Sequence, residues 1–156
     1  MKARVATKKD AEGVAKVLVD AYNIDTVNEG KKAFLTWLDE KQEFIVVEDD
    51  GEIAGIASWT IHDLPKHELA ELNKIAVLSS FKGKGHARVL FEEIVEVIKK
   101  FYVDNGFKLR KLYLLTHSSN KRARRFYEKL GFIYETELMD HYYHGENECV
   151  YSIFYR

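Results

Sequence analysis

Cysteine and proline are nearly absent from this sequence: its 156 residues hold one of each, Cys149 and Pro65. A lone cysteine cannot form a disulfide within the chain, which excludes a small disulfide-stapled scaffold. Cys149 stands between Glu148 and Val150 in a strand-like run, and we interpret it as an inert side chain of that strand. The single proline leaves no proline-rich linker that would divide the chain, so we expect one domain spanning residues 1–156.

Long apolar runs and an excess of either charge are also lacking. Nowhere do about 18 apolar residues follow one another, and the amino terminus has no hydrophobic signal region. The 24 basic and 25 acidic side chains give a formal net charge of −1. That balance recruits neither nucleic acid nor an anionic membrane. We therefore expect a cytoplasmic globular protein with neither of those partners.

The apolar periodicity predicts alternating helices and strands of a mixed-sheet α/β (α+β) domain. A capping box at Thr7 and Asp10 precedes the first predicted helix, and Gly131 ends the last one. Helices are predicted over residues 11–22, 28–38, from a glycine-containing loop to about residue 104, and 120–130. Strands are predicted over residues 2–6, 44–47, 53–61, 69–78, 112–116, 133–143 and 148–155, the last two forming a hairpin around His144 and Gly145.

The loop before the longest predicted helix, Lys82–Arg88, has the features of an anion site. Its glycines let the backbone approach a phosphate closely, and the helix start supplies unpaired N–H groups. The P-loop pattern requires Gly-Lys followed by Ser or Thr, and it is excluded because Gly85 and then His86 follow Gly83 and Lys84. The dinucleotide fingerprint is excluded because Arg88 stands where a third Gly or Ala is required. A plain turn between strand and helix explains the same residues equally well.

A second pattern lies in the last predicted helix. Asn120, Ala123 and Tyr127 are spaced i, i+3 and i+7, so one helical face carries an amide, a small gap and a phenol. Asn120 and Tyr127 are separated by about 10 Å along the axis at 1.5 Å per residue. Such a face can lie along an extended ligand, and a capping Asn with a core Tyr is the alternative interpretation.

Together, the two patterns resemble the GNAT superfamily of N-acetyltransferases over nearly the whole chain. The resemblance is most specific over residues 75–88 and 120–132, where Lys82 replaces the usual glutamine or arginine of the family's Q/R-x-x-G-x-G/A loop. It implies an acyl-CoA N-acyltransferase fold with about seven mostly antiparallel strands, four helices and a splayed central parallel strand pair. It also implies acetyl-CoA as co-substrate. No two histidines have His-Glu-x-x-His spacing, so we expect no metal.

The resemblance assigns roles to particular residues. Tyr127 matches the family's proton donor to the departing thiolate, and Asn120 and Ala123 match positions beside the cofactor. The backbone that pairs with the pantetheine arm is Ile75, Ala76 and Val77. The residues expected at the pyrophosphate are Lys82, Gly83, Lys84, Gly85, His86, Ala87 and Arg88.

The general base is left open by the sequence. Glu71 is our first candidate, because it lies upstream on the strand beside the cofactor, where related enzymes place a glutamate or a water relay. His117 and His67 are alternatives. The tail over residues 138–146 also resembles protein N-terminal acetyltransferases, including the ribosomal-protein alanine type. In that branch a glutamate often serves as base where this sequence has Leu115.

We therefore expect an N-acetyltransferase that moves the acetyl group of acetyl-CoA to a primary amine by direct attack in a ternary complex. The acceptor is a peptide or protein amino terminus or a small amine, and the alternative is a catalytically silent acyl-CoA-binding module. The oligomeric state stays open, a homodimer included. Candidates for acceptor selection are Tyr22, Asn23, Asp25, Trp37, Tyr142 and Tyr143. A basic cluster that contacts the 3′-phosphate of the coenzyme or forms a solvated helical face contains Lys121, Arg122, Arg124 and Arg125.

Overall fold

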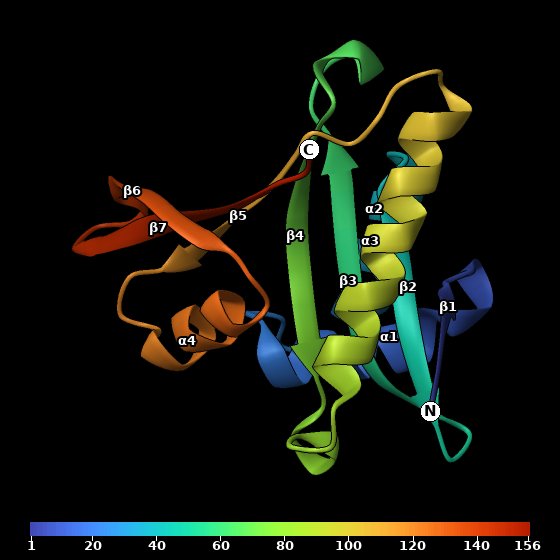
Figure 1. Cartoon of the computed structure of the whole chain (residues 1–156). Helices are drawn as coiled ribbons and strands as arrows, with labels where there is room; N and C mark the ends of the chain where they lie inside the picture. The colour runs from blue at the N-terminus through green and yellow to red at the C-terminus, as the bar shows by residue number, and fades with distance from the viewer. The chain divides into compact units, whose positions relative to one another are not determined.

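The computed structural model describes residues 1–156 and contains seven strands and four α-helices. The strands form one sheet in the order β1-β2-β3-β4-β5-β7-β6 (Figure 1). Strands β4 and β5 pair in parallel, and the pairs β1–β2, β2–β3, β5–β7 and β6–β7 are antiparallel. The predicted mixed sheet with four helices is confirmed. The chain divides into two compact units, residues 1–60 with 74–100 and residues 61–73 with 101–156.

The helices and strands follow one another in the predicted order. Short 3-10 turns at Lys8–Asp10, Pro65–His67 and Ser79–Phe81 were not predicted. The last strand begins two residues before its predicted start, because Gly145 (φ 83°) completes a tight turn and Tyr143 already pairs with Glu146. The strands are β1 (Lys2–Val5), β2 (Glu43–Asp49), β3 (Glu52–Ile61), β4 (Leu69–Val77), β5 (Lys111–His117), β6 (Ile133–Tyr143) and β7 (Glu146–Phe154). The helices are α1 (Ala11–Ala21), α2 (Val27–Asp39), α3 (His86–Asp104) and α4 (Lys121–Lys129).

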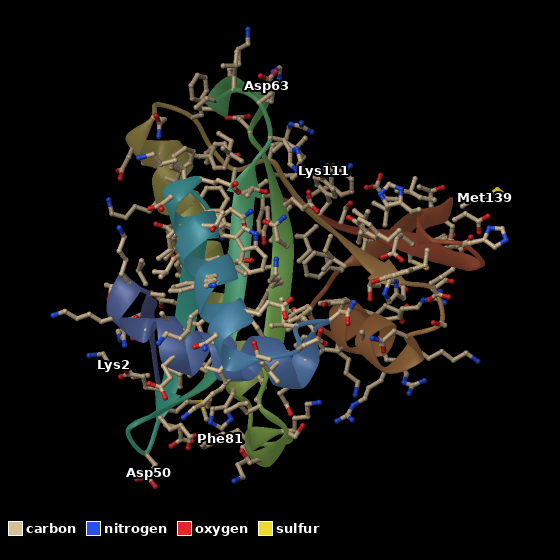
Figure 2. All side chains as sticks on the ribbon, turned by 180° about the vertical axis from the view of Figure 1, so that it is seen from behind. Lys2, Asp50, Asp63, Phe81, Lys111 and Met139 are labelled. Carbon is tan, nitrogen blue, oxygen red and sulfur yellow. The ribbon has the colours of Figure 1, made fainter.

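The first unit is a layered arrangement with helices on both faces of its strands. Helices α1 and α2 cover one face and α3 covers the other (Figures 1 and 2). Apolar side chains of α1, α2, β2 and β3 interlock in its core, where Phe34 and Phe44 meet edge to face at 5.1 Å between ring centroids. None of the helices is long and apolar enough to cross a membrane.

An ion-pair network fixes the start of α1 to the adjacent strands. Arg4 on β1 donates two hydrogen bonds to the Asp10 carboxylate, both of 2.8 Å, and a third of 2.6 Å to Glu48 on β2. The Thr7 backbone N–H also donates to Asp10, at 2.8 Å, which supplies one half of the predicted capping box. The Arg4 guanidinium is the main cause that holds the pKa of Asp10 below its usual value. Arg4 on β1 thus joins the start of α1 and β2 through one guanidinium.

Replacing Asp10 by Asn should lower the free energy of unfolding by about 1–2 kcal/mol at pH 7, since hydrogen bonds between charged groups are lost. The folded-state pKa of Asp10 lies below the unfolded value of 3.8. Its contribution is therefore present above pH 3.8 and is lost as the pH falls through the folded-state pKa. Urea unfolding at a series of pH values measures the difference.

The control for this experiment is Asp39→Asn. Asp39 faces Lys8 at 3.7 Å, and both side chains are more than 70% exposed, so its loss should change stability by less than about 0.5 kcal/mol. Equal effects of the two substitutions at pH 7 would contradict the role assigned to the Asp10 network.

The second unit contains the β5–β7–β6 part of the sheet, with α4 tied to β7. On β5, Leu112, Leu114 and Thr116 are buried, and the alternate positions, which include Tyr113 and His117, are half-buried on the opposite face. On α4, Arg124 donates to the Tyr151 hydroxyl at 3.1 Å, and this hydroxyl donates to Glu128 at 2.9 Å. The far end of β6 extends into solvent, where Met139 is 82% exposed (Figure 2). The face of β5 that carries Tyr113 and His117 is the one on which the groups of the candidate site lie.

Candidate active site

The loop before α3 has the backbone geometry that an anion site requires. Gly83 and Gly85 have φ values of 81° and 90°, a conformation that residues with a side chain rarely adopt. A Cβ at either position would meet nothing within 4 Å, so the loop backbone is open. Lys82, Lys84 and Arg88 are exposed around it, and α3 begins directly afterwards at His86. These features fit a phosphate at the helix start, and a plain turn has the same geometry, so contact with the pyrophosphate stays a prediction.

Both ends of this loop are fixed by carboxylates of the first unit. The Ser79 backbone N–H donates to Asp20 at 3.0 Å. At the other end, His86 is 1% exposed and its Nε2 hydrogen-bonds Asp49 at 2.7 Å. The bond with His86 is the main cause that lowers the pKa of Asp49. Phe81 in the loop and the turn at Asp50 lie at the same end of the unit (Figure 2).

His86 was expected among the pyrophosphate residues because of its place in the motif. Its side chain is buried between Asp49 and the Phe81 ring, with 5.3 Å between ring centroids, and its Nδ1 is buried without a hydrogen-bond partner. The imidazole therefore holds the loop in place. The backbone N–H of His86 is the group that can meet a phosphate.

The end of β4 carries the backbone expected to pair with pantetheine. Two side chains that were expected to select the acceptor contact this segment. The Tyr22 hydroxyl lies 3.5 Å from the Ile75 carbonyl oxygen, and the Lys74 ammonium lies 4.1 Å from the centroid of the Trp37 ring. Residues of α1 and α2 therefore reach the strand on which the cofactor is expected.

Helix α4 presents the second expected half-site. The Asn120 side-chain oxygen accepts a 3.1 Å hydrogen bond from the Ala123 N–H, so Asn120 caps the helix. Tyr127 lies beside Phe126 and Phe132, with centroid distances of 5.6 and 5.8 Å. Burial raises the pKa of Tyr127 to about 12. The phenol therefore keeps its proton at neutral pH.

The basic residues of α4 are not equivalent. Arg124 is half-buried and engaged, because its guanidinium also donates to the Ser118 carbonyl at 3.0 Å. Lys121, Arg122 and Arg125 are exposed. Within the predicted basic cluster, these three are available to a phosphate without loss of an internal contact.

Glu71, the first candidate for the base, is held by two other side chains. Its Oε1 lies 2.7 Å from His62 Nε2 and 3.1 Å from the Tyr113 hydroxyl. The hydroxyl also lies 2.8 Å from His62 Nε2, so the three polar atoms form a triangle. Burial, and then the charge of Glu71, raises the pKa of Tyr113, which keeps the phenol as a donor. Both contacts to Glu71 use Oε1, which leaves Oε2 for an acceptor.

A second histidine–carboxylate pair lies on the same face of β5. His117 Nδ1 is hydrogen-bonded to Glu148, whose side chain is 4% exposed. Glu146 lies 4.0 Å from the same ring nitrogen. The pKa of Tyr142 is raised mainly by burial and then by the negative charges of Glu71 and Glu148. Tyr142 therefore interacts with both carboxylates. This face of the second unit therefore gathers acidic and phenolic groups.

Sequence reasoning missed His62, Tyr113 and Glu148. His62 follows β3 directly, and its backbone N–H donates to Leu69, which starts β4. The hairpin between these strands could have indicated that His62 lies near Glu71. Tyr113 is opposite Glu71 in the parallel register, which the sequence does not show. His67, an alternative base, instead contacts Asp63 at 3.2 Å.

No group of three or more His, Cys, Asp or Glu side chains lies together as the ligands of a metal would. The expectation of a metal-free protein stays a prediction.

The model of the acetyltransferase (GNAT) family matches residues 12–132, which is more than half of the chain. The chain belongs to the acetyltransferase (GNAT) family. The spermidine N(1)-acetyltransferase of Escherichia coli K12 is 33% identical over 108 residues, covering 67% of this chain and 53% of that protein. An uncharacterized N-acetyltransferase of Methanocaldococcus jannaschii is 30% identical over 140 residues, covering 83% of this chain and 59% of its own length. The chain thus spans little more than half the length of these GNAT relatives.

Solved structures show the same fold. A ribosomal-protein-alanine N-acetyltransferase from Brucella melitensis has a TM-score of 0.77 and 16% identity, covering 99% of this chain and 100% of the other. A spermidine N-acetyltransferase variant from Vibrio cholerae has a TM-score of 0.76 and 20% identity, covering 99% of this chain and 95% of the other. At these identities the likeness shows the GNAT fold alone.

Substituting Gly83 or Gly85 by Asp should weaken acetyl-CoA binding by at least roughly 10²-fold, since a carboxylate would stand where the pyrophosphate is expected. Isothermal titration with acetyl-CoA measures the loss, and thermal unfolding confirms that the variants are folded.

The matched control is Gly106→Asp. Gly106 also has a positive φ, 85°, and open space around its Cβ position, so the backbone strain and the added charge are the same. A folded Gly83 variant with unchanged affinity would remove the loop from the cofactor site.

Proposed function

We propose that this chain is an acetyl-CoA-dependent N-acetyltransferase that acetylates a primary amine by direct attack in a ternary complex. The observation that carries this proposal is the arrangement around Glu71. A carboxylate on β4, held by two donors through one oxygen, lies four residues upstream of the backbone expected at the pantetheine. The open glycine loop before α3 supports acetyl-CoA as the donor.

The reaction requires removal of a proton from the amine before attack. A primary alkylamine titrates near pH 10, so it binds as an ammonium and attacks only when neutral. Glu71 Oε2 binds this ammonium and accepts its proton, directly or through water. The nitrogen then forms the bond to the acetyl carbon, and the carbon–sulfur bond breaks. One further proton of the attacking nitrogen goes to the sulfur, and one proton per turnover is released to solvent.

Tyr127 assists departure of the sulfur. A thiol titrates near pH 8.5, below the pKa of about 12 that burial gives the phenol. A thiolate therefore does not fully deprotonate Tyr127. The phenol stabilises the developing negative charge by donating a hydrogen bond to the sulfur, as an oxyanion-hole donor does for oxygen.

The acceptor that we propose binds as a cation, because a primary alkylamine is protonated near neutral pH. Carboxylates and phenol faces of the second unit attract an ammonium, and Glu71, Tyr113 and Tyr142 provide both. Relatives named above act on spermidine or on a ribosomal-protein alanine. A linear polyamine and a peptide beginning with alanine are therefore the two acceptors that we propose for this chain.

The deciding experiment incubates the protein with acetyl-CoA and a panel of amines, including spermidine and an alanine-starting peptide. Mass spectrometry identifies the acetylated product, and thiol release gives the rate. Acetylation of one acceptor well above the spontaneous rate is expected. Tight acetyl-CoA binding without transfer to any amine would instead favour a catalytically silent acyl-CoA-binding module.

Glu71→Gln should reduce kcat by roughly 10²-fold or more, because the amide cannot accept the amine's proton. Acetyl-CoA affinity should be unchanged, since the substitution leaves the loop before α3 intact. Steady-state rates over pH 6 to 9 and titration with acetyl-CoA test both parts. Full activity across that range would exclude Glu71 as the base.

Tyr127→Phe keeps the ring and its packing but removes the hydrogen-bond donor. We expect kcat to fall by roughly 10-fold to 10³-fold, with acetyl-CoA affinity and thermal stability retained. The matched control is Tyr134→Phe, a 46%-exposed tyrosine on β6. A wild-type kcat in Tyr127→Phe would reduce the role of this phenol to packing.

A further inference from the structure

The polar triangle around Glu71 has a consequence for how the acceptor binds. An ionised carboxylate only accepts hydrogen bonds, so His62 Nε2, at 2.7 Å from Glu71 Oε1, carries the hydrogen of that contact. The Tyr113 O–H donates to the same oxygen. Two donors from two different elements thus fix one oxygen of Glu71. The carboxylate plane is held, and Oε2 keeps its direction.

The free nitrogen of His62 can still take up a proton. His62 Nε2 is occupied within the triangle, and 41% of the His62 side chain is exposed, against 18% for Glu71. Protonation at Nδ1 therefore converts a neutral donor into a cation in contact with Glu71. A free imidazole titrates near pH 6.5, within the range in which enzymes operate.

We infer that His62 is a positioning residue for Glu71. The neutral imidazole permits binding of the acceptor's ammonium, whereas the imidazolium opposes it. This inference rests on the proposed role of Glu71 as the group that meets the acceptor. Neutral His62 orients the carboxylate and leaves its negative charge to the substrate. Protonated His62 neutralises that charge at Oε1, so an ammonium at Oε2 is held less tightly.

The other groups around the triangle do not replace His62 in this role. Tyr113, from β5, keeps its proton because burial and Glu71 raise its pKa. Tyr142, from β6, has a pKa raised by burial and then by Glu71, so it too is uncharged near neutrality. Neither phenol therefore changes its charge when the pH falls from 7.5 to 5.5, whereas an imidazole is the type of side chain that ordinarily titrates in this range.

The test measures spermidine affinity by isothermal titration at pH 5.5 and pH 7.5, with the protein saturated with coenzyme A. For the wild type we expect roughly 10-fold weaker binding at pH 5.5, the size of one contact to a charged group. His62→Gln keeps an N–H donor that cannot be protonated, so its affinity should change by less than about twofold between the two pH values. Its affinity at pH 7.5 should match that of the wild type.

Two further variants separate positioning from general damage. His62→Ala removes the donor and should weaken spermidine binding roughly 10-fold at pH 7.5 without a change in coenzyme A affinity. In Glu71→Gln the pH dependence should disappear, because the charge that His62 neutralises is gone. His144→Gln is the matched control, since the His144 side chain is fully exposed and contacts only Asp140, at 3.5 Å.

Failure of this inference is distinguishable from failure of the proposed function. Acetylation of spermidine by the wild type, with an affinity that His62→Gln leaves equally dependent on pH, would overturn the inference alone. Binding of spermidine with the expected pH dependence, but without acetyl transfer to it or to the alanine peptide, would overturn the function alone. If the wild type binds no spermidine, the titrations are repeated with the alanine-starting peptide. A wild-type affinity for this peptide that does not depend on pH overturns the inference.

Discussion

The parallel register between β4 and β5 decides which side chains meet in the candidate acceptor site. Glu71 lies opposite Tyr113 only because Leu69 pairs with Lys111. A shift of one residue would turn Tyr113 to the opposite face of the sheet, where its neighbours on β5 are buried. Glu71 would then lose one of its two donors. The chemistry proposed here therefore depends on a backbone ladder rather than on the identity of the carboxylate alone.

Local signals in the sequence were enough to predict most of the elements and the glycine loop before α3. Helix boundaries, the glycine loop and the Asn120 cap depend on residues close together in the chain, so short patterns predict them. The partners of Glu71 depend instead on contacts between residues that are distant in the chain. His62 is nine residues away and Tyr113 is 42 residues away, and hydrophobic periodicity does not encode strand register between distant segments. The contact between the half-buried His117 and the buried Glu148 was not predicted for the same reason.

His86 shows how a motif position can differ from a side-chain role. The spacing of the glycines correctly predicted a loop that leads into α3. It did not indicate that the imidazole would be buried against Asp49, since this contact depends on the turn between β2 and β3. A buried, carboxylate-bound histidine fixes the start of a helix whose first N–H groups are free. The loop can then present its backbone to an anion with little further loss of conformational freedom.

The two groups proposed to act on protons differ in what their surroundings favour. Burial among Phe126, Phe132 and the rest of its environment raises the pKa of Tyr127 to about 12, so this phenol retains its proton throughout the reaction. Glu71 instead accepts hydrogen bonds from His62 and Tyr113 through one oxygen, so its other oxygen keeps its direction. In the proposed reaction, a phenol that keeps its proton donates to the departing sulfur, and a carboxylate held in one orientation meets the amine. The His62 contact, which comes from the segment directly after β3, therefore links the orientation of Glu71 to a residue outside the strand that carries it.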